Sequence, residues 1–70
     1  MNAITFSDIR KGSQIMVRGG FGNDVPRPAT VQGLIPNIKK HGQGGIDYFF
    51  TPSGQVYWAY LDQIDEVLEY

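Results

Sequence analysis

Apolar side chains alternate most densely in residues 46–60, IDYFFTPSGQVYWAY. The central TPSGQ segment is typical of a three-residue hairpin loop, because Pro52 and Ser53 suit a type I turn and Gly54 suits the left-handed conformation after it. This loop places Thr51 opposite Gln55, and side chains then alternate between the two faces of the hairpin. The register predicts one buried face made of three opposing pairs: Phe50–Val56, Tyr48–Trp58 and Ile46–Tyr60.

The other face of this hairpin is mixed and carries one cross-strand aromatic pair, Phe49–Tyr57. Such a pair is either a small cluster covered by a terminus or loop, which is the more ordinary arrangement, or an exposed contact surface. The buried face, by contrast, must supply much of the core. Truncation of a buried Trp58 to alanine is expected to cost about 3–5 kcal/mol.

Shorter apolar patterns predict three further strands. Residues 14–18 alternate, with Ile15 and Val17 inward, and residues 29–35 form a second strand in which Gly33 marks a bulge or bend. Residues 64–68 form the last strand, after a single 3-10 turn at residues 61–63. A helix over residues 60–68 is the alternative, because its apolar residues also fall at helical spacing.

The segments between these strands are rich in glycine, proline and polar residues. Residues 19–24, GGFGND, are expected to form an irregular turn with positive φ angles, and residues 36–45 a polar loop. Ser7 or Asp8 is suited to cap a single helical turn before the first strand. The segments between the strands therefore read as loops.

These elements predict one all-β domain over residues 1–70, a five-stranded β-barrel with a 3-10 turn before the last strand. Its predicted core is the set of inward apolar positions: Ile15, Val17, Val31, Ile46, Tyr48, Phe50, Val56, Trp58, Leu61 and Ile64.

Two segments carry a family resemblance. The pattern K-G-x-x-I-x-V-x-G at residues 11–19, followed by A-T-V-x-G at residues 29–33, resembles the opening of a KOW or Tudor-type unit. Residues 46–48 and the WAYLDQI of residues 58–64 resemble its close. The chain is thus similar, over residues 9–68, to Src-homology-3-like (SH3-like) barrels and to small uncharacterised proteins of bacteria and their prophages. The resemblance implies the barrel fold and leaves the function open.

Composition narrows the class of protein. The chain of 70 residues has no cysteine, so disulfides and thiolate metal sites are excluded. It has no apolar run of membrane-spanning length and no signal-peptide pattern at its start, so we expect a cytoplasmic protein with no membrane partner.

Charged residues are unevenly distributed along the chain. Residues 1–41 hold all six Lys and Arg against Asp8 and Asp24, and the charged residues of 42–70 are all acidic. The halves either form a bipolar surface or interleave and cancel.

Catalytic motifs are not evident. His41 is the single histidine and has no acid or nucleophile near it in sequence, so a solvated loop residue is the better interpretation. The glycines of residues 19–22 are not followed by the Gly-Lys-Ser/Thr of a phosphate loop. We therefore expect no enzyme activity, no metal and no cofactor.

The predicted function is a non-catalytic interaction module that binds a protein partner through loops 19–28 and 37–43 and an aromatic surface. The candidate aromatic residues are Phe21, Phe49, Tyr57 and Tyr60. The alternative is binding of RNA or single-stranded DNA by the basic half, with Arg18, Arg27, Lys39 and Lys40 as candidates. A homo-oligomer that pairs through a sheet edge or the Phe49–Tyr57 pair is a third option without specific support. A phage or prophage origin is suggested by the resemblance alone.

Overall fold

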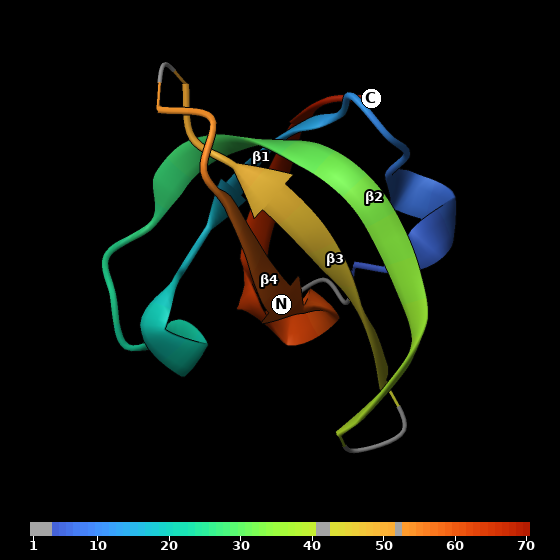
Figure 1. The fold of residues 1–70 in the computed structure, drawn as a ribbon. Helices are drawn as coiled ribbons and strands as arrows, with labels where there is room; N and C mark the ends of the chain where they lie inside the picture. The colour runs from blue at the N-terminus through green and yellow to red at the C-terminus, as the bar shows by residue number, and fades with distance from the viewer. Residues whose placement is uncertain (1–3, 41–42, 52) are drawn as a thin grey trace.

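The protein is all-β, with five antiparallel strands in one sheet and no α-helix in the described residues (Figure 1). A computed structural model describes residues 4–40, 43–51 and 53–70, without the side chains of Phe21, residues 37–40 and Gln43. The strands are β1 (Gln14–Val17), β2 (Arg27–Lys40), β3 (Gln43–Phe49), β4 (Val56–Tyr60) and β5 (Ile64–Glu69). Three 3-10 turns join them: η1 (Phe6–Asp8), η2 (Gly20–Gly22) and η3 (Leu61–Gln63).

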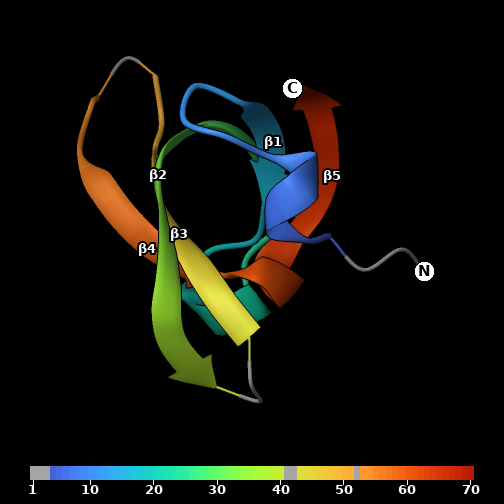
Figure 2. The ribbon, with the colours of Figure 1, turned by 90° about the vertical axis from the view of Figure 1, so that its right-hand side faces the viewer.

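The strand order is β4-β3-β2-β1-β5, so β4 and β5 end the sheet and the hydrogen-bonded order does not close. β2 is long enough to pair with β1 through residues 27–30 and with β3 from Thr30 onward. Its register shifts between Val31 and Gly33, in agreement with the bulge or bend predicted at this glycine. In Figure 2, β3 and β4 lie on one side, β1 and β5 on the other, and β2 curves between them.

The core lies inside this curved sheet. Seven of the predicted core residues are buried: Ile15, Val17, Val31, Ile46, Tyr48, Leu61 and Ile64. Phe50 packs against them half-buried. The predicted core did not include Ile9, Ala29 or Ala59, and all three are buried. The ring of Phe6 occupies the space that a Cβ on Gly44 would take, so the N-terminal segment is held on β3.

The predicted hairpin register is wrong by one residue. Phe49 faces Val56, Tyr48 faces Tyr57 and Ile46 faces Ala59. The turn closes on Phe50 instead of Thr51, because the Phe50 carbonyl accepts hydrogen bonds from Gly54 N (3.0 Å) and Ser53 Oγ (3.2 Å). Gly54 does adopt the expected left-handed conformation, with φ at 71°. The loop is longer than the sequence suggested, and β4 is turned over as a result.

This shift reverses the two faces of β4. Trp58 and Val56, both predicted to be buried, are 47% and 49% exposed, and Ala59 is fully buried in their place. Successive side chains of a strand point to opposite faces, so a shift of the register by one residue moves every side chain of β4 to the other face. Because Trp58 is half-exposed, the large loss in free energy of unfolding expected for Trp58→Ala no longer applies.

The other element predictions have mixed outcomes. The 3-10 turn at residues 61–63 and the final strand are confirmed, and the alternative helix over residues 60–68 is wrong. Positive φ angles at Gly20 (58°) and Gly22 (93°) confirm the turn expected there. The polar loop predicted over residues 36–45 is wrong, because β2 runs on to Lys40 and β3 begins at Gln43. An irregularity in the register between Ile35 and Lys40 spans Pro36.

The basic and acidic halves of the sequence interleave in the fold. Strand β1, from the basic half, pairs with the acidic β5, and Arg18 Nε lies 2.6 Å from Asp65 Oδ1. Among the described residues, no helix has the length and apolar character needed to cross a membrane.

Candidate functional site

Three aromatic rings form a cluster where β3 and β4 meet the loop between them. Tyr48 lies on β3, Phe50 directly follows β3, and Tyr57 is the cross-strand partner of Tyr48 on β4. The Tyr48 and Tyr57 rings stack with centroids 5.8 Å apart, and Phe50 lies 5.4 Å from Tyr48 and 5.7 Å from Tyr57. We call Tyr48, Phe50 and Tyr57 the aromatic cluster.

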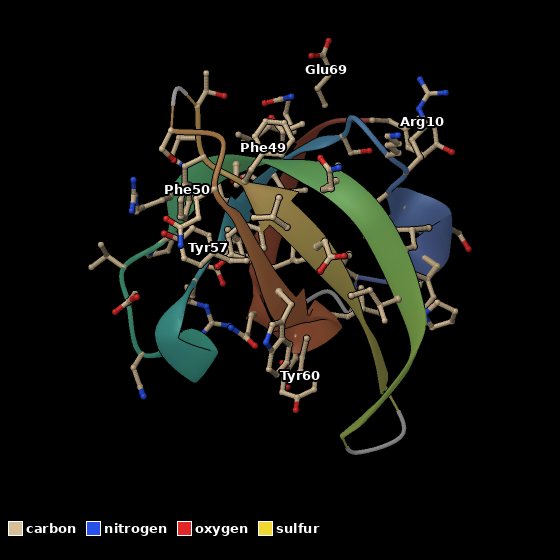
Figure 3. All side chains as sticks on the ribbon, viewed as in Figure 1. Arg10, Phe49, Phe50, Tyr57, Tyr60 and Glu69 are labelled. Carbon is tan, nitrogen blue, oxygen red and sulfur yellow. The ribbon has the colours of Figure 1, made fainter. Side chains whose placement is uncertain are left out.

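The cluster runs from the core to the surface. Tyr48 is 3% exposed, Phe50 is half-buried, and Tyr57 is 41% exposed. Arg27 is exposed, and its guanidinium carbon lies 3.9 Å from the Phe50 ring centroid. Figure 3 shows Phe50 and Tyr57 close together on one side of the molecule. The arrangement offers an apolar surface with a fixed inner part and a cation beside it.

The loop between β1 and β2 lies against the same cluster. A Cβ on Gly19 would stand 3.1 Å from the Asp24 carboxylate and 3.4 Å from the Tyr48 hydroxyl, so the absence of a side chain lets the loop approach this closely. Burial, then Tyr57 and the Asp24 carboxylate, raise the pKa of the Tyr48 phenol, and the Arg27 guanidinium partly opposes them. These surroundings favour the neutral, protonated phenol of Tyr48.

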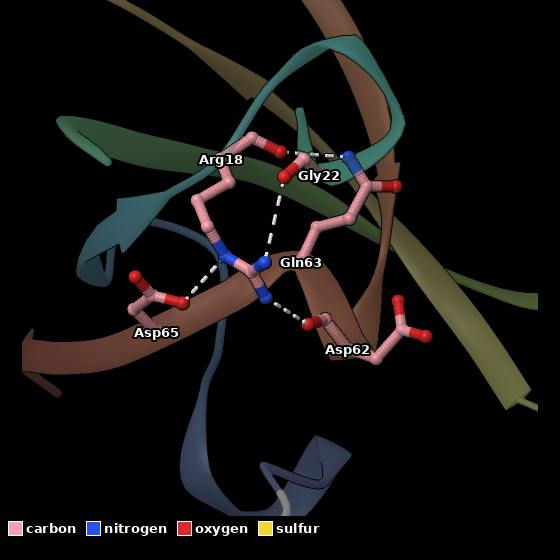
Figure 4. A network of polar contacts seen from close by, with 5 residues as sticks. All are labelled: Arg18, Gly22, Asp62, Gln63 and Asp65. Atoms are coloured by element: carbon pink, nitrogen blue, oxygen red, sulfur yellow. Dashed lines mark hydrogen bonds and ion pairs between the residues drawn. The ribbon is translucent and has the colours of Figure 1, made fainter. Parts of the chain in front are cut away.

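A polar network fixes the start of this loop (Figure 4). Arg18 Nε pairs with Asp65, its Nη2 donates to the Asp62 carbonyl at 2.8 Å, and its Nη1 donates to the Gly22 carbonyl at 3.5 Å. The Gln63 amide donates to the Arg18 carbonyl at 2.8 Å. Because the Arg18 guanidinium already has three partners within the molecule, it holds η2 against η3 and β5.

The structure separates several of the predicted site residues. Phe49 and Tyr57 lie on opposite faces of the hairpin, so the predicted pair does not form, for the same reason that the register is shifted. Tyr60 lies at the far end of β4 from the cluster, with its ring edge-on to Trp58 at 5.1 Å. The side chains of Phe21, Lys39 and Lys40 lie outside the described residues.

Of the predicted candidates, the structure brings together Tyr57 and Arg27, both of which contact Phe50. Tyr48 and Phe50 were assigned to the core alone, and Asp24 was not considered as a site residue. The spacing of Tyr48 and Phe50, two residues apart on one strand, was a usable signal, since it places both rings on one face of the sheet. The partner on β4 could not be identified without the correct loop length.

Within the described residues, no group of three or more His, Cys, Asp or Glu side chains is arranged to hold a metal ion. Comparison of the chain with protein-family models, with curated proteins and with solved structures gave no match, so the candidate site rests on its geometry.

Proposed function

We propose that this chain is an Src-homology-3-like barrel that acts as a non-catalytic interaction module and binds a protein partner through the aromatic cluster. Three features support the barrel: β1 lies between β2 and β5, the long β2 pairs with strands on both sides of the core, and a 3-10 turn precedes β5. The function depends on the cluster and not on closure of the sheet.

The observation that carries the function is the contact of three rings that span the range from buried to exposed. Rigid aromatic side chains supply contact area at low entropic cost, and such residues dominate the binding energy of many interfaces. The buried Tyr48 holds Tyr57 and Phe50 in place, so part of the contact surface is formed before any ligand arrives.

The side chains in and around the aromatic cluster indicate which groups a ligand would present. An apolar or aromatic side chain of a peptide would pack on Tyr57 and Phe50, where it buries apolar surface. A polar group of the peptide backbone would reach the hydroxyl of the exposed Tyr57, and a carboxylate would pair with the exposed Arg27.

Selection of random displayed peptides against the immobilised chain tests this proposal. Peptides enriched on the wild type should bind Tyr57→Ala about ten-fold or more weakly, since loss of a central aromatic anchor commonly costs this much. Leu68→Ala is the matched control, because Leu68 is also an exposed apolar residue but lies on β5. Equal binding to wild type and Tyr57→Ala would contradict the proposal.

Nucleic-acid binding is the competing outcome of the same experiment. A single-stranded oligonucleotide is titrated in parallel at low and moderate salt, because phosphate contacts weaken steeply as salt rises. Arg18 is already paired, which leaves Arg27 as the described candidate cation beside the rings. Tight, salt-sensitive oligonucleotide binding without any enriched peptide would favour that function over protein binding.

A further inference from the structure

The outer face of the sheet, opposite the aromatic cluster, carries a second set of residues with different chemistry. The registers align Gly33 of β2 with Asp47 of β3, and Asp47 with Trp58 of β4. We call Gly33, Asp47 and Trp58 the outer row. Tyr48 and Tyr57 are the next residues along the same two strands, so they point to the other face. The outer row is therefore physically separate from the proposed peptide site.

Asp47 is the one charged residue among the described side chains of this part of the outer face. The neighbouring rows that the registers align on either side are uncharged: Thr30, Phe49 and Val56, and Ile35, Gly45 and Tyr60. Asp47 is half-buried, and among the described residues its carboxylate has no ion pair and accepts no hydrogen bond from a side chain. A carboxylate partly removed from water in apolar surroundings gains from a cationic partner.

The two flanking positions can both contact such a partner. A Cβ on Gly33 would meet no atom of the described residues within 4 Å, so a ligand side chain can approach Asp47 from the β2 side. On the β4 side, the indole of Trp58 contacts the Tyr60 ring edge-on, and Trp58 is nevertheless 47% exposed; indole is the best aromatic surface for a cation. Cross-strand neighbours stand about 4.5–5.5 Å apart at Cβ, within reach of one ligand side chain.

We propose that the outer row binds an arginine side chain of a partner protein, whose guanidinium pairs with the Asp47 carboxylate and stacks on the Trp58 indole. Arginine fits better than lysine because its planar guanidinium can stack and donate two hydrogen bonds at once. A second copy of this chain fits poorly, because facing outer rows would bring two Asp47 carboxylates together. The site does not depend on the proposed function of the aromatic cluster.

Amide and indole chemical shifts measured during titration with acetyl-Gly-Arg-Gly-amide test the site. Shifts should saturate at the amides of Gly33 and Asp47 and at the Trp58 indole N–H, and should shrink as salt rises. The glutamine analogue of the peptide, which has no charge, should leave these signals unchanged. Equal shifts with the glutamine peptide, shifts confined to the aromatic cluster, or no shift up to high millimolar peptide would each overturn the proposal.

Variants identify the residues responsible. Asp47→Asn should weaken arginine-peptide binding by about three- to ten-fold, the value of one exposed charge pair with its stacking contact. Asp62→Asn is the matched control, since it removes the same charge from an exposed position whose backbone carbonyl, not its carboxylate, contacts Arg18. Trp58→Phe, which keeps an aromatic ring, should weaken binding less than Trp58→Ala. Unchanged affinity in Asp47→Asn would overturn the proposal, and well-dispersed amide spectra establish that each variant is folded.

Discussion

At the scale of single residues, burial in the hairpin is decided by where the loop closes. Val56 and Trp58 are the larger apolar residues of β4, and composition alone favours burying them. The Phe50 carbonyl accepts from Gly54, however, which turns the small Ala59 inward and leaves Trp58 half-exposed. The aromatic content of this hairpin was readable from the sequence, but the choice of face was not, because both loop lengths suit a TPSGQ segment.

The register makes a prediction about stability that distinguishes the two faces. Trp58→Ala should lower the free energy of unfolding by less than about 2 kcal/mol, because about half of this side chain is already in water. Ile46→Ala, at a fully buried position, should cost about 2–5 kcal/mol. Urea denaturation of both variants measures the difference. A cost for Trp58→Ala as large as that for Ile46→Ala would restore the register with Trp58 in the core.

At the scale of elements, local sequence signals succeeded where a glycine or an apolar alternation sets the backbone directly. Gly33 bends β2, Gly20 and Gly22 form the turn before it, and residues 61–63 form the 3-10 turn. The polar composition of residues 36–45 predicted a loop, but β2 and β3 extend into this segment. Pairing between neighbouring strands here outweighs the weak strand propensity of the polar residues. For the site, Tyr57 and Arg27 were among the predicted candidates, for protein and for nucleic-acid binding respectively, but their meeting around Phe50 depends on contacts between distant segments.

Packing of η1 on β3 provides the test at this scale. Gly44→Ala should lower the free energy of unfolding by about 1–3 kcal/mol, because the new methyl group occupies the position of the Phe6 ring. Phe6→Ala removes that ring, so the double variant should be less destabilised than the sum of the two single variants. Thermal or urea unfolding of the four proteins measures this coupling. Additive effects would show that Phe6 does not pack on Gly44.

At the scale of the whole molecule, the segments that meet around Arg18 and Gln63 come from both ends of the chain. The Gln63 side chain is buried and accepts from Tyr60 N at 3.0 Å while it donates to the Arg18 carbonyl. Arg18 N in turn donates to the Gln63 carbonyl at 2.8 Å. These bonds join the end of β1 to the 3-10 turn before β5, which brings the basic and acidic halves together.

The buried side-chain amide of Gln63 should contribute more to the free energy of unfolding than the exposed Arg18–Asp65 ion pair. The Arg18 and Asp65 side chains are 35% and 38% exposed, and pairs of this kind contribute only about 0–1 kcal/mol, so Asp65→Asn should change stability little. Gln63→Leu removes two part-buried side-chain hydrogen bonds, one from the Tyr60 N–H and one to the Arg18 carbonyl, at about 1–2 kcal/mol for each lost bond. We therefore expect Gln63→Leu to lower the free energy of unfolding by about 2–4 kcal/mol, and urea denaturation of the two variants measures both effects. If Asp65→Asn proved the more damaging, the β1–β5 junction would depend on charge, and its stability would also have to fall with added salt.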